Sequence, residues 1–243
     1  MWQIFSKEIS SFFSGLTGYI TIFIFLLVTS LFLWLFPDTS VLEYGFATLD
    51  SLFFIAPWIF LFLIPAITMR SFSEELRTGT MEFLYTKPLS EYQIILGKYF
   101  GTVALIALAL LPTLIYFVTV YQLASPVGNV DTGAVYGSYL GLLFLGAVFA
   151  AIGIFASSLT KNQIIAFLLA ILLCFFFYYA IDYVARLKIF FGGIDSIIES
   201  LGVRHHYDSI SRGVLDTRDV VYFLSVIIFF LLLTKTVLNS RKW

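Results

Sequence analysis

The sequence predicts an all-α integral membrane protein with six transmembrane helices. Hydrophobic residues make up 60% of its 243 residues and charged residues only 12%, whereas soluble domains are about 45–50% apolar and about 25% charged. The few charged residues are also grouped, so that they separate long segments without any charge. A soluble fold with so little polar surface could not cover its own core.

The charge-free segments predict the spans. A membrane helix needs about 20 consecutive, mostly apolar residues, and charge is absent from residues 9–37, 51–69, 99–130, 132–160, 162–181 and 220–234. We expect helices near 17–36, 50–69, 99–122, 134–159, 162–181 and 219–238. The last helix extends past Lys235, because a lysine near a helix end can reach the membrane surface. Residues 1–243 are expected to form a single membrane domain.

Positive charge predicts the orientation. Six spans place both termini on one side, and cytoplasmic segments of membrane proteins carry an excess of Lys and Arg. The segments on the side of the termini hold nine of the 14 Lys and Arg residues, and the loops 37–49 and 123–133 hold none. The loop 182–218 holds five, which its acids balance. Both termini are therefore expected in the cytoplasm.

The segment before the first span predicts an amphipathic helix over residues 2–13. Its apolar residues recur at helical spacing, and polar residues gather on the opposite face, which is typical of a helix that lies in the membrane interface. Gly15 and Gly18 favour a bend between this helix and the first span. The alternative is that the segment only begins that span. The apolar residues are Trp2, Phe5, Ile9 and Phe12.

A dense mixed-charge segment, residues 71–101, separates the second and third predicted spans. It holds seven charged residues, four acids and three bases. Ser71 with Glu74, and Ser90 with Gln93, match the capping box that begins a helix. A cytoplasmic location accounts for the positive charges of this segment, but it does not account for the four acids.

Gly79 and Pro88 bracket a short helix near residues 80–85. Met81, Leu84 and Tyr85 share one face of that helix. A small apolar face with a polar rim is typical of a docking surface. The alternative is a solvated loop whose charges only fix the topology.

The sequence EELRTGTMEFLYTKPLSEYQIILGKYFG, residues 74–101, resembles the cytosolic loop of ABC-2 type permeases. That family has six spans, cytosolic termini and an N-terminal interfacial elbow helix, so the resemblance covers the whole chain. The stretch HHYDSISRGVLDTRDVVYFLS, residues 205–225, is similar to the GldF-type permeases of gliding motility in Bacteroidota and to the permease of nitrous-oxide reductase maturation. The loop positions that match are Glu75, Gly79, Thr80, Glu82, Leu84, Pro88, Leu89, Ser90, Gly97 and Lys98.

The resemblance implies a subunit in the bacterial inner membrane, driven by a cytosolic ABC ATPase. The implied partners are a GldA-like ATPase, a GldG-like second permease or a second copy of this chain, and membrane lipid. The short helix would be the coupling helix that docks on the ATPase through Gly79, Thr80, Met81, Glu82, Leu84, Tyr85 and Pro88. The sequence contains no G-x-x-x-x-G-K-[ST] phosphate loop, so we expect this chain to bind no cofactor and the ATPase to hold ATP and Mg²⁺.

The loop 182–218 would, by the same resemblance, cap the outer end of the pathway as a gate. Asp216 and Asp219 are expected to cap the last span. No metal site is expected, because His205 and His206 are adjacent and so do not share a helix face as an i, i+4 pair does. The residues of this predicted gate are His205, His206, Asp208, Arg212, Asp216, Arg218 and Asp219.

Other classes of function fit the sequence less well. The net charge of −1 argues against a nucleic-acid partner. An ion-coupled carrier normally keeps ionisable residues in mid-membrane, and an enzyme needs a catalytic constellation that the lone Cys174 lacks. A membrane anchor or scaffold without transport stays an alternative. Small residues four apart in the fourth span, such as Gly137 and Gly141, allow close contact within the subunit or across a dimer.

Overall fold

The computed structural model describes residues 1–43, 45–82, 89–187, 195–213 and 216–240, and every regular element in these residues is a helix. The helices are α1 (Trp2–Ser14), α2 (Leu16–Trp34), α3 (Asp50–Thr68), α4 (Ser73–Thr78), α6 (Glu91–Leu110), the 3₁₀ turn η1 (Leu111–Thr113), α7 (Leu114–Leu123), α8 (Thr132–Leu159), α9 (Gln163–Phe175), the π-helical turn η2 (Phe176–Ala180), α10 (Ile181–Ala185), α11 (Asp195–Ser200), α12 (Val203–Ile210) and α13 (Thr217–Ser240).

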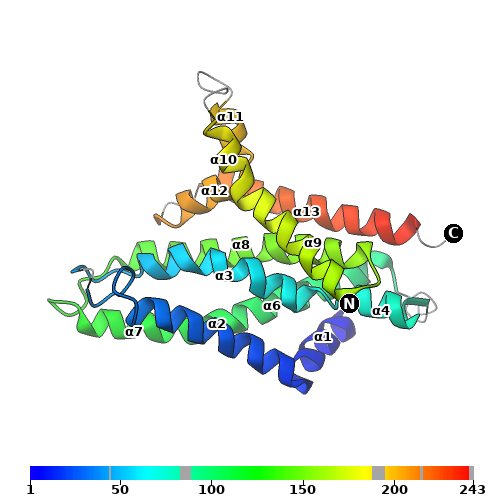
Figure 1. The fold of residues 1–243 in the computed structure, drawn as a ribbon, viewed down its shortest axis with the longest axis horizontal. Coiled ribbons are helices and arrows are strands. Elements are labelled where there is room, and N and C mark those ends of the chain that lie inside the picture. Colours follow the sequence, from blue (N-terminus) through cyan, green and yellow to red (C-terminus); the bar gives the residue numbers. More distant parts are fainter. Residues whose placement is uncertain (44, 83–88, 188–194, 214–215, 241–243) are drawn as a thin grey trace.

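The long helices form a bundle around α8 (Figure 1). Helices α3, α6, α9 and α13 all pack against α8, and α2 packs against α3. Helix α9 crosses the bundle obliquely, and α10 and α11 project from it (Figure 1). Helix α4, the N-terminus and the C-terminal end of α13 lie toward one end, which we call the α4 end (Figure 1). The opposite end, where α3 begins and α12 lies, is called the α12 end.

The predicted spans coincide with helices of the structure. Five stretches of the described residues are long and apolar enough to cross a membrane: Asp50–Thr78, Glu91–Leu123, Thr132–Leu159, Gln163–Ala185 and Thr217–Ser240. Helices α1 and α2 qualify as a sixth only when the two are taken together across a bend of 73°. The count of six therefore stays a prediction, and the five later spans lie close to their predicted positions.

The predicted N-terminal helix and its bend are present. Helix α1 ends at Ser14, and Gly15 has an extended backbone that separates α1 from α2. Gly18 lies inside α2, where a Cβ would come within 2.2 Å of the backbone oxygen of Phe12. The absence of a side chain at Gly18 therefore allows the end of α1 to fold close against α2.

Glycines of α8 bring neighbouring helices of the same subunit close. A Cβ on Gly146 would lie 2.9 Å from Ile106 of α6, and one on Gly153 would lie 2.1 Å from the hydroxyl of Thr68. A Cβ on Gly137 would lie 2.8 Å from the Cα of Gly213. Small residues at helix contacts let backbones approach closely in membrane proteins. The small-residue face of the fourth predicted span thus packs within the subunit at these positions.

We expect Gly137→Ala to lower the free energy of unfolding by about 1–3 kcal/mol, because the new methyl group meets the backbone of Gly213, which cannot rotate away. The matched control is Gly133→Ala in the same helix, where the nearest atom to a Cβ is 3.4 Å away. That change should be neutral or stabilising by up to about 1 kcal/mol. Thermal unfolding of both purified variants measures the difference, and equal stability would contradict this packing.

Candidate functional site

The predicted coupling residues begin where α4 ends. Gly79 has a φ of 73°, in the left-handed region, and follows the last residue of α4. This conformation favours glycine at helix ends. The Thr78 hydroxyl bonds to the backbone oxygen of Glu74 at 2.8 Å and lies 2.9 Å from the Thr80 hydroxyl. Gly79 therefore breaks the helix as predicted.

Met81 departs from the prediction. It was expected on an exposed apolar face with Leu84 and Tyr85, but only 5% of Met81 is exposed and it belongs to the hydrophobic core. Burying the apolar Met81 side chain in the core is more favourable in free energy than leaving it exposed to solvent. Glu82 is exposed. Leu84, Tyr85 and Pro88 lie outside the described residues, so their docking role stays a prediction.

One of the two predicted helix caps is confirmed. Ser90 accepts a hydrogen bond from the backbone nitrogen of Gln93 at 3.3 Å, and the Gln93 side chain accepts one from the Ser90 backbone at 3.2 Å. The cap at Ser71 and Glu74 is wrong. The first amides of α4, those of Phe72 and Ser73, instead donate to the Ser157 hydroxyl of α8 at 2.9 and 3.1 Å.

A buried lysine joins three helices at the α4 end. The Lys98 side chain is 3% exposed, and its Nζ donates to Glu8 of α1 at 2.9 Å, to Glu75 of α4 at 3.0 Å and to the backbone oxygen of Ser71 at 2.6 Å. Lys7, whose side chain is 61% exposed, adds a 3.3 Å contact to Glu75. A buried charge is tolerated when it is paired and hydrogen-bonded. We call these four side chains the Lys98 cluster.

Helix α1 reaches this cluster because α6 has glycines where the two helices touch. A Cβ on Gly97 would lie 2.9 Å from Ile4, and one on Gly101 would lie 2.9 Å from the Glu8 side chain. Ile4 is buried, whereas Trp2 of the predicted interfacial face is 75% exposed. Phe5, Ile9 and Phe12 are partly buried. The face toward α6 was missed in the sequence, although glycines four residues apart at positions 97 and 101 signal such a contact.

The predicted gate residues divide into two groups at the α12 end. In the first, Arg204 of α12 contacts Asp182 of α10 at 3.2 Å and Asp208 at 3.5 Å. Asp182 is buried and also contacts Arg186 at 3.2 Å. Burial raises the pKa of the Asp208 carboxyl above its usual range, although nearby Arg204 opposes the shift. Asp182 and Arg204 were missed, because nothing local in the sequence shows that residues 22 apart meet.

The second group centres on His206. Its Nδ1 lies 2.6 Å from Asp219 of α13, its Nε2 lies 2.9 Å from the backbone oxygen of Ser200, and its ring stacks on Tyr222 at 3.9 Å between centroids. Both ring nitrogens of His206 thus lie against oxygen atoms of neighbouring elements, the Asp219 carboxylate and the Ser200 carbonyl. Asp219 therefore pairs with His206, and it is Asp216 that accepts the amide of Arg218 at 2.9 Å at the start of α13.

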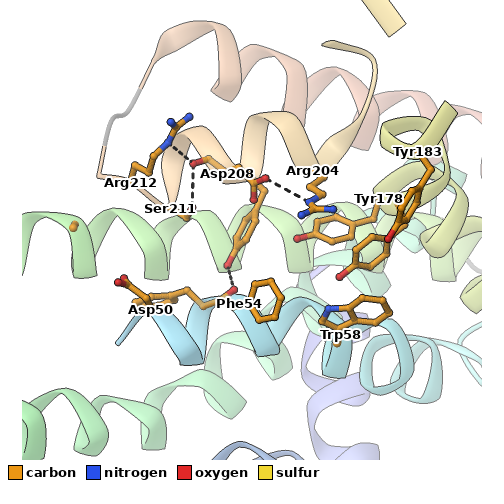
Figure 2. A pocket seen from close by; sticks show the side chains of 13 residues that line it. Asp50, Phe54, Trp58, Tyr178, Tyr183, Arg204, Asp208, Ser211 and Arg212 are labelled. Carbon is orange, nitrogen blue, oxygen red and sulfur yellow. Dashed lines mark hydrogen bonds and ion pairs between the residues drawn. The ribbon is translucent and has the colours of Figure 1, made fainter. Parts of the chain in front are cut away.

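The remaining gate residues make weaker contacts. His205 lies 3.6 Å from Glu199, and Arg212 donates to the backbone oxygen of Asp208 at 3.0 Å. Within the described residues, no group of three or more His, Cys, Asp or Glu side chains is placed to hold a metal ion. Arg204, Asp208 and Arg212 also line a cavity that lies between α3, η2 and α12 (Figure 2).

Comparison with protein families decides the class of this molecule. A family model described as ABC-2 family transporter protein matches residues 2–239. The chain belongs to the ABC-2 transporter family. A search of curated proteins finds no match. The resemblance of residues 74–101 to ABC-2 type permeases is thereby confirmed at the level of the family.

Membership gives this chain a defined place in an assembly. An ABC-2 permease is the multi-pass transmembrane subunit of an ABC transporter, and it works with an ABC ATPase and membrane lipid. Membrane subunits of the family are generally non-catalytic, with the ATPase activity in a partner. The apolar helices of the structure agree with such a subunit.

We expect Lys98→Met to lower the free energy of unfolding by about 3–5 kcal/mol, because it leaves the buried Glu75 carboxylate and the partly buried Glu8 carboxylate without the cation that they share. The control is Lys7→Met, which removes the exposed cation of the same cluster and should cost at most about 1 kcal/mol. Thermal unfolding in detergent measures both. Equal, small effects would show that Lys98 does not hold the three helices together.

Proposed function

We propose that this chain couples ATP hydrolysis by a partner ATPase to movement of its own spans, and that the loop between α4 and α6 is the docking site. The observation that carries the proposal is the attachment of the two helices that flank this loop. Gly79 ends α4 on one side, the Ser90 cap begins α6 on the other, and the Lys98 cluster fastens both helices to α1. Because both flanking helices are fastened in this way, a displacement at either end of the loop is passed into the bundle.

The two ends of the loop lead directly into spans. Helix α4 continues the apolar stretch of α3, within Asp50–Thr78, and α6 begins the stretch Glu91–Leu123. A displacement of the loop therefore acts on two spans at once. Lys98 extends this action to α1, because one side chain contacts all three helices. Closure of two ATPase subunits on nucleotide would supply the displacement.

The assignment of the membrane, the orientation and the individual partners rests on the sequence resemblances. We infer that the chain lies in a bacterial inner membrane with both termini and the α4 end in the cytoplasm, since that end carries most of the positive charge. ATP and Mg²⁺ would bind the ATPase, because this sequence has no phosphate-binding loop. The similarity of residues 205–225 to GldF-type permeases favours a gliding-motility transporter, with a GldA-like ATPase and a GldG-like permease as partners.

We expect the double variant Leu84→Asp, Tyr85→Asp to lose the ATPase. Two carboxylates would be desolvated at an apolar docking face, and a central interface residue of this kind is worth 2 kcal/mol or more, which corresponds to roughly 30-fold in affinity. The measurement is the amount of ATPase that co-purifies with the tagged chain in mild detergent.

The control carries the same two charges at exposed sites of the α12 end, as Leu42→Asp with Val127→Asp; these side chains are 64% and 70% exposed. Both variants should insert into the membrane to the same level. Normal ATPase recovery with the loop variant would overturn the docking site. Substrate-stimulated ATP hydrolysis in nanodiscs then separates a transporter from a scaffold, since a scaffold shows no stimulation.

A further inference from the structure

Two cavities meet at Phe54 and Trp58 of α3, toward the α12 end. The first has a volume of about 500 Å³ and lies between α3, η2 and α12 (Figure 2). The second has a volume of about 630 Å³ and lies between α2 and α3, where Phe167 of α9 touches it. Phe54 and Trp58 line both cavities. Each volume is typical of a small-molecule site, which holds about 300–1,000 Å³.

The first cavity combines aromatic faces with charges of both signs. The rings of Trp58 and Tyr179 stack at 4.2 Å between centroids, and Tyr183 stands nearby (Figure 2). Arg204 already contacts two carboxylates. Asp50 and Arg212 are both exposed at the rim. The rim therefore presents one carboxylate and one guanidinium to a ligand.

The second cavity is an apolar groove. It is lined by one face of α2 and one face of α3, and its side chains include Ile24, Phe25, Val28, Phe32, Phe62 and Leu63. Along α3 the lining runs from Phe54 to Ala66, which are twelve residues and about 18 Å apart at the rise of an α-helix. A groove of this length accepts an extended alkyl chain.

With Asp50 placed at the membrane surface, the junction of the two cavities lies within the hydrocarbon core. Trp58 follows Asp50 by eight residues, or about 12 Å along the helix, in a hydrocarbon core about 30 Å thick. Phe54 is 68% and Trp58 is 41% exposed, and they are one turn apart on the same face of α3. Two large aromatic side chains thus stand between a charged compartment, which includes Asp50, and an apolar one that extends along α3 to Ala66.

We propose that the two cavities form one binding site for a membrane amphiphile with a zwitterionic aminoalkyl-phosphate head. The alkyl chain lies in the groove between α2 and α3. The ammonium group faces the Asp50 carboxylate, and the phosphate accepts hydrogen bonds from Arg212. The inference deepens the proposed function by naming a ligand class, and it rests on that function only in placing the α12 end at a membrane surface.

Other ligand classes fit only half of the site. A purely apolar molecule would cover charged groups without pairing them, which is costly. A soluble polar molecule would leave the apolar groove unused. An amphiphile that passes over Phe54 and Trp58 satisfies both compartments, because these two side chains line each of them.

The probe for the test is lysophosphatidylethanolamine with a photoreactive diazirine in its alkyl chain. The full chain is placed in phosphatidylglycerol nanodiscs, so that the surrounding lipid lacks an ammonium group. We expect saturable labelling that maps to residues 21–32 and 54–66. Unlabelled lysophosphatidylethanolamine should compete roughly ten-fold better than lysophosphatidylglycerol, because only the first provides the charge-assisted contact to Asp50.

Two variants and two matched controls make the test specific. Trp58→Ala and Arg212→Gln should each raise the half-saturating concentration by roughly ten-fold, the effect of losing one strong contact. Phe229→Ala, which alters a residue 53% exposed on α13, and Arg218→Gln, which removes an exposed charge outside the cavity, should leave the labelling unchanged. Arg212 is exposed, so its variant tests the site even if Trp58→Ala fails to fold.

Unsaturable labelling spread over all lipid-facing helices, or equal effects of variants and controls, would overturn the proposal. So would an oxidative cross-link between two copies of Phe62→Cys that the lysolipid does not displace, because the groove would then be covered by a second copy. Recovery of the ATPase with each variant is measured in parallel. Normal recovery with lost labelling, or the reverse, shows which of the two proposals has failed.

Discussion

The close contact of α8 with its neighbours is the constraint on which the rest of the structure depends. Lipid tails are as apolar as the helix surfaces, so helices in a membrane associate through tight packing more than through the hydrophobic effect. Gly137, Gly146 and Gly153 admit the turn after α12, helix α6 and the end of α3. The position of α3 then fixes both ends of the molecule, because α4 follows it at one end and the Phe54 and Trp58 pair lies toward the other.

At the α4 end, the second constraint is the satisfaction of polar groups. Backbone amides and charges near the bilayer need partners within the protein. Ser157 supplies them for the start of α4, and Glu8, Glu75 and Ser71 supply them for Lys98. One oxygen of Glu75, Oε2, is buried without a hydrogen-bond partner among the described residues. Loss of one partner from these contacts would leave the other partner buried without a hydrogen bond, which costs free energy. This cost keeps α1, α4 and α6 together.

Sequence predicts the helices of this protein well and the contacts between them poorly. Charge-free segments locate the later spans, and the Ser90 cap follows from residues three apart. Burial of Met81, the cap from Ser157 and the pairing of Asp182 with Arg204 depend on residues that only the folded chain brings together. The hydrogen bond from Tyr207 to the backbone of Phe53 joins residues 154 positions apart, and no local pattern announces it. Gly97 and Gly101 are the exception, since their spacing is visible in the sequence.

The π-helical turn η2 (Phe176–Ala180) sets the direction in which the segment after it faces. An α-helix advances about 100° per residue, and a π turn holds one residue more than the α-helical turn it replaces. If the same residues formed a regular α-helix, everything that follows would therefore be turned by more than a quarter of a circle. Asp182 would swing away from Arg204, and the contact between α10 and α12 would be lost. The extra residue of η2 thus aligns α10 with α12, although the two helices are far apart in the sequence.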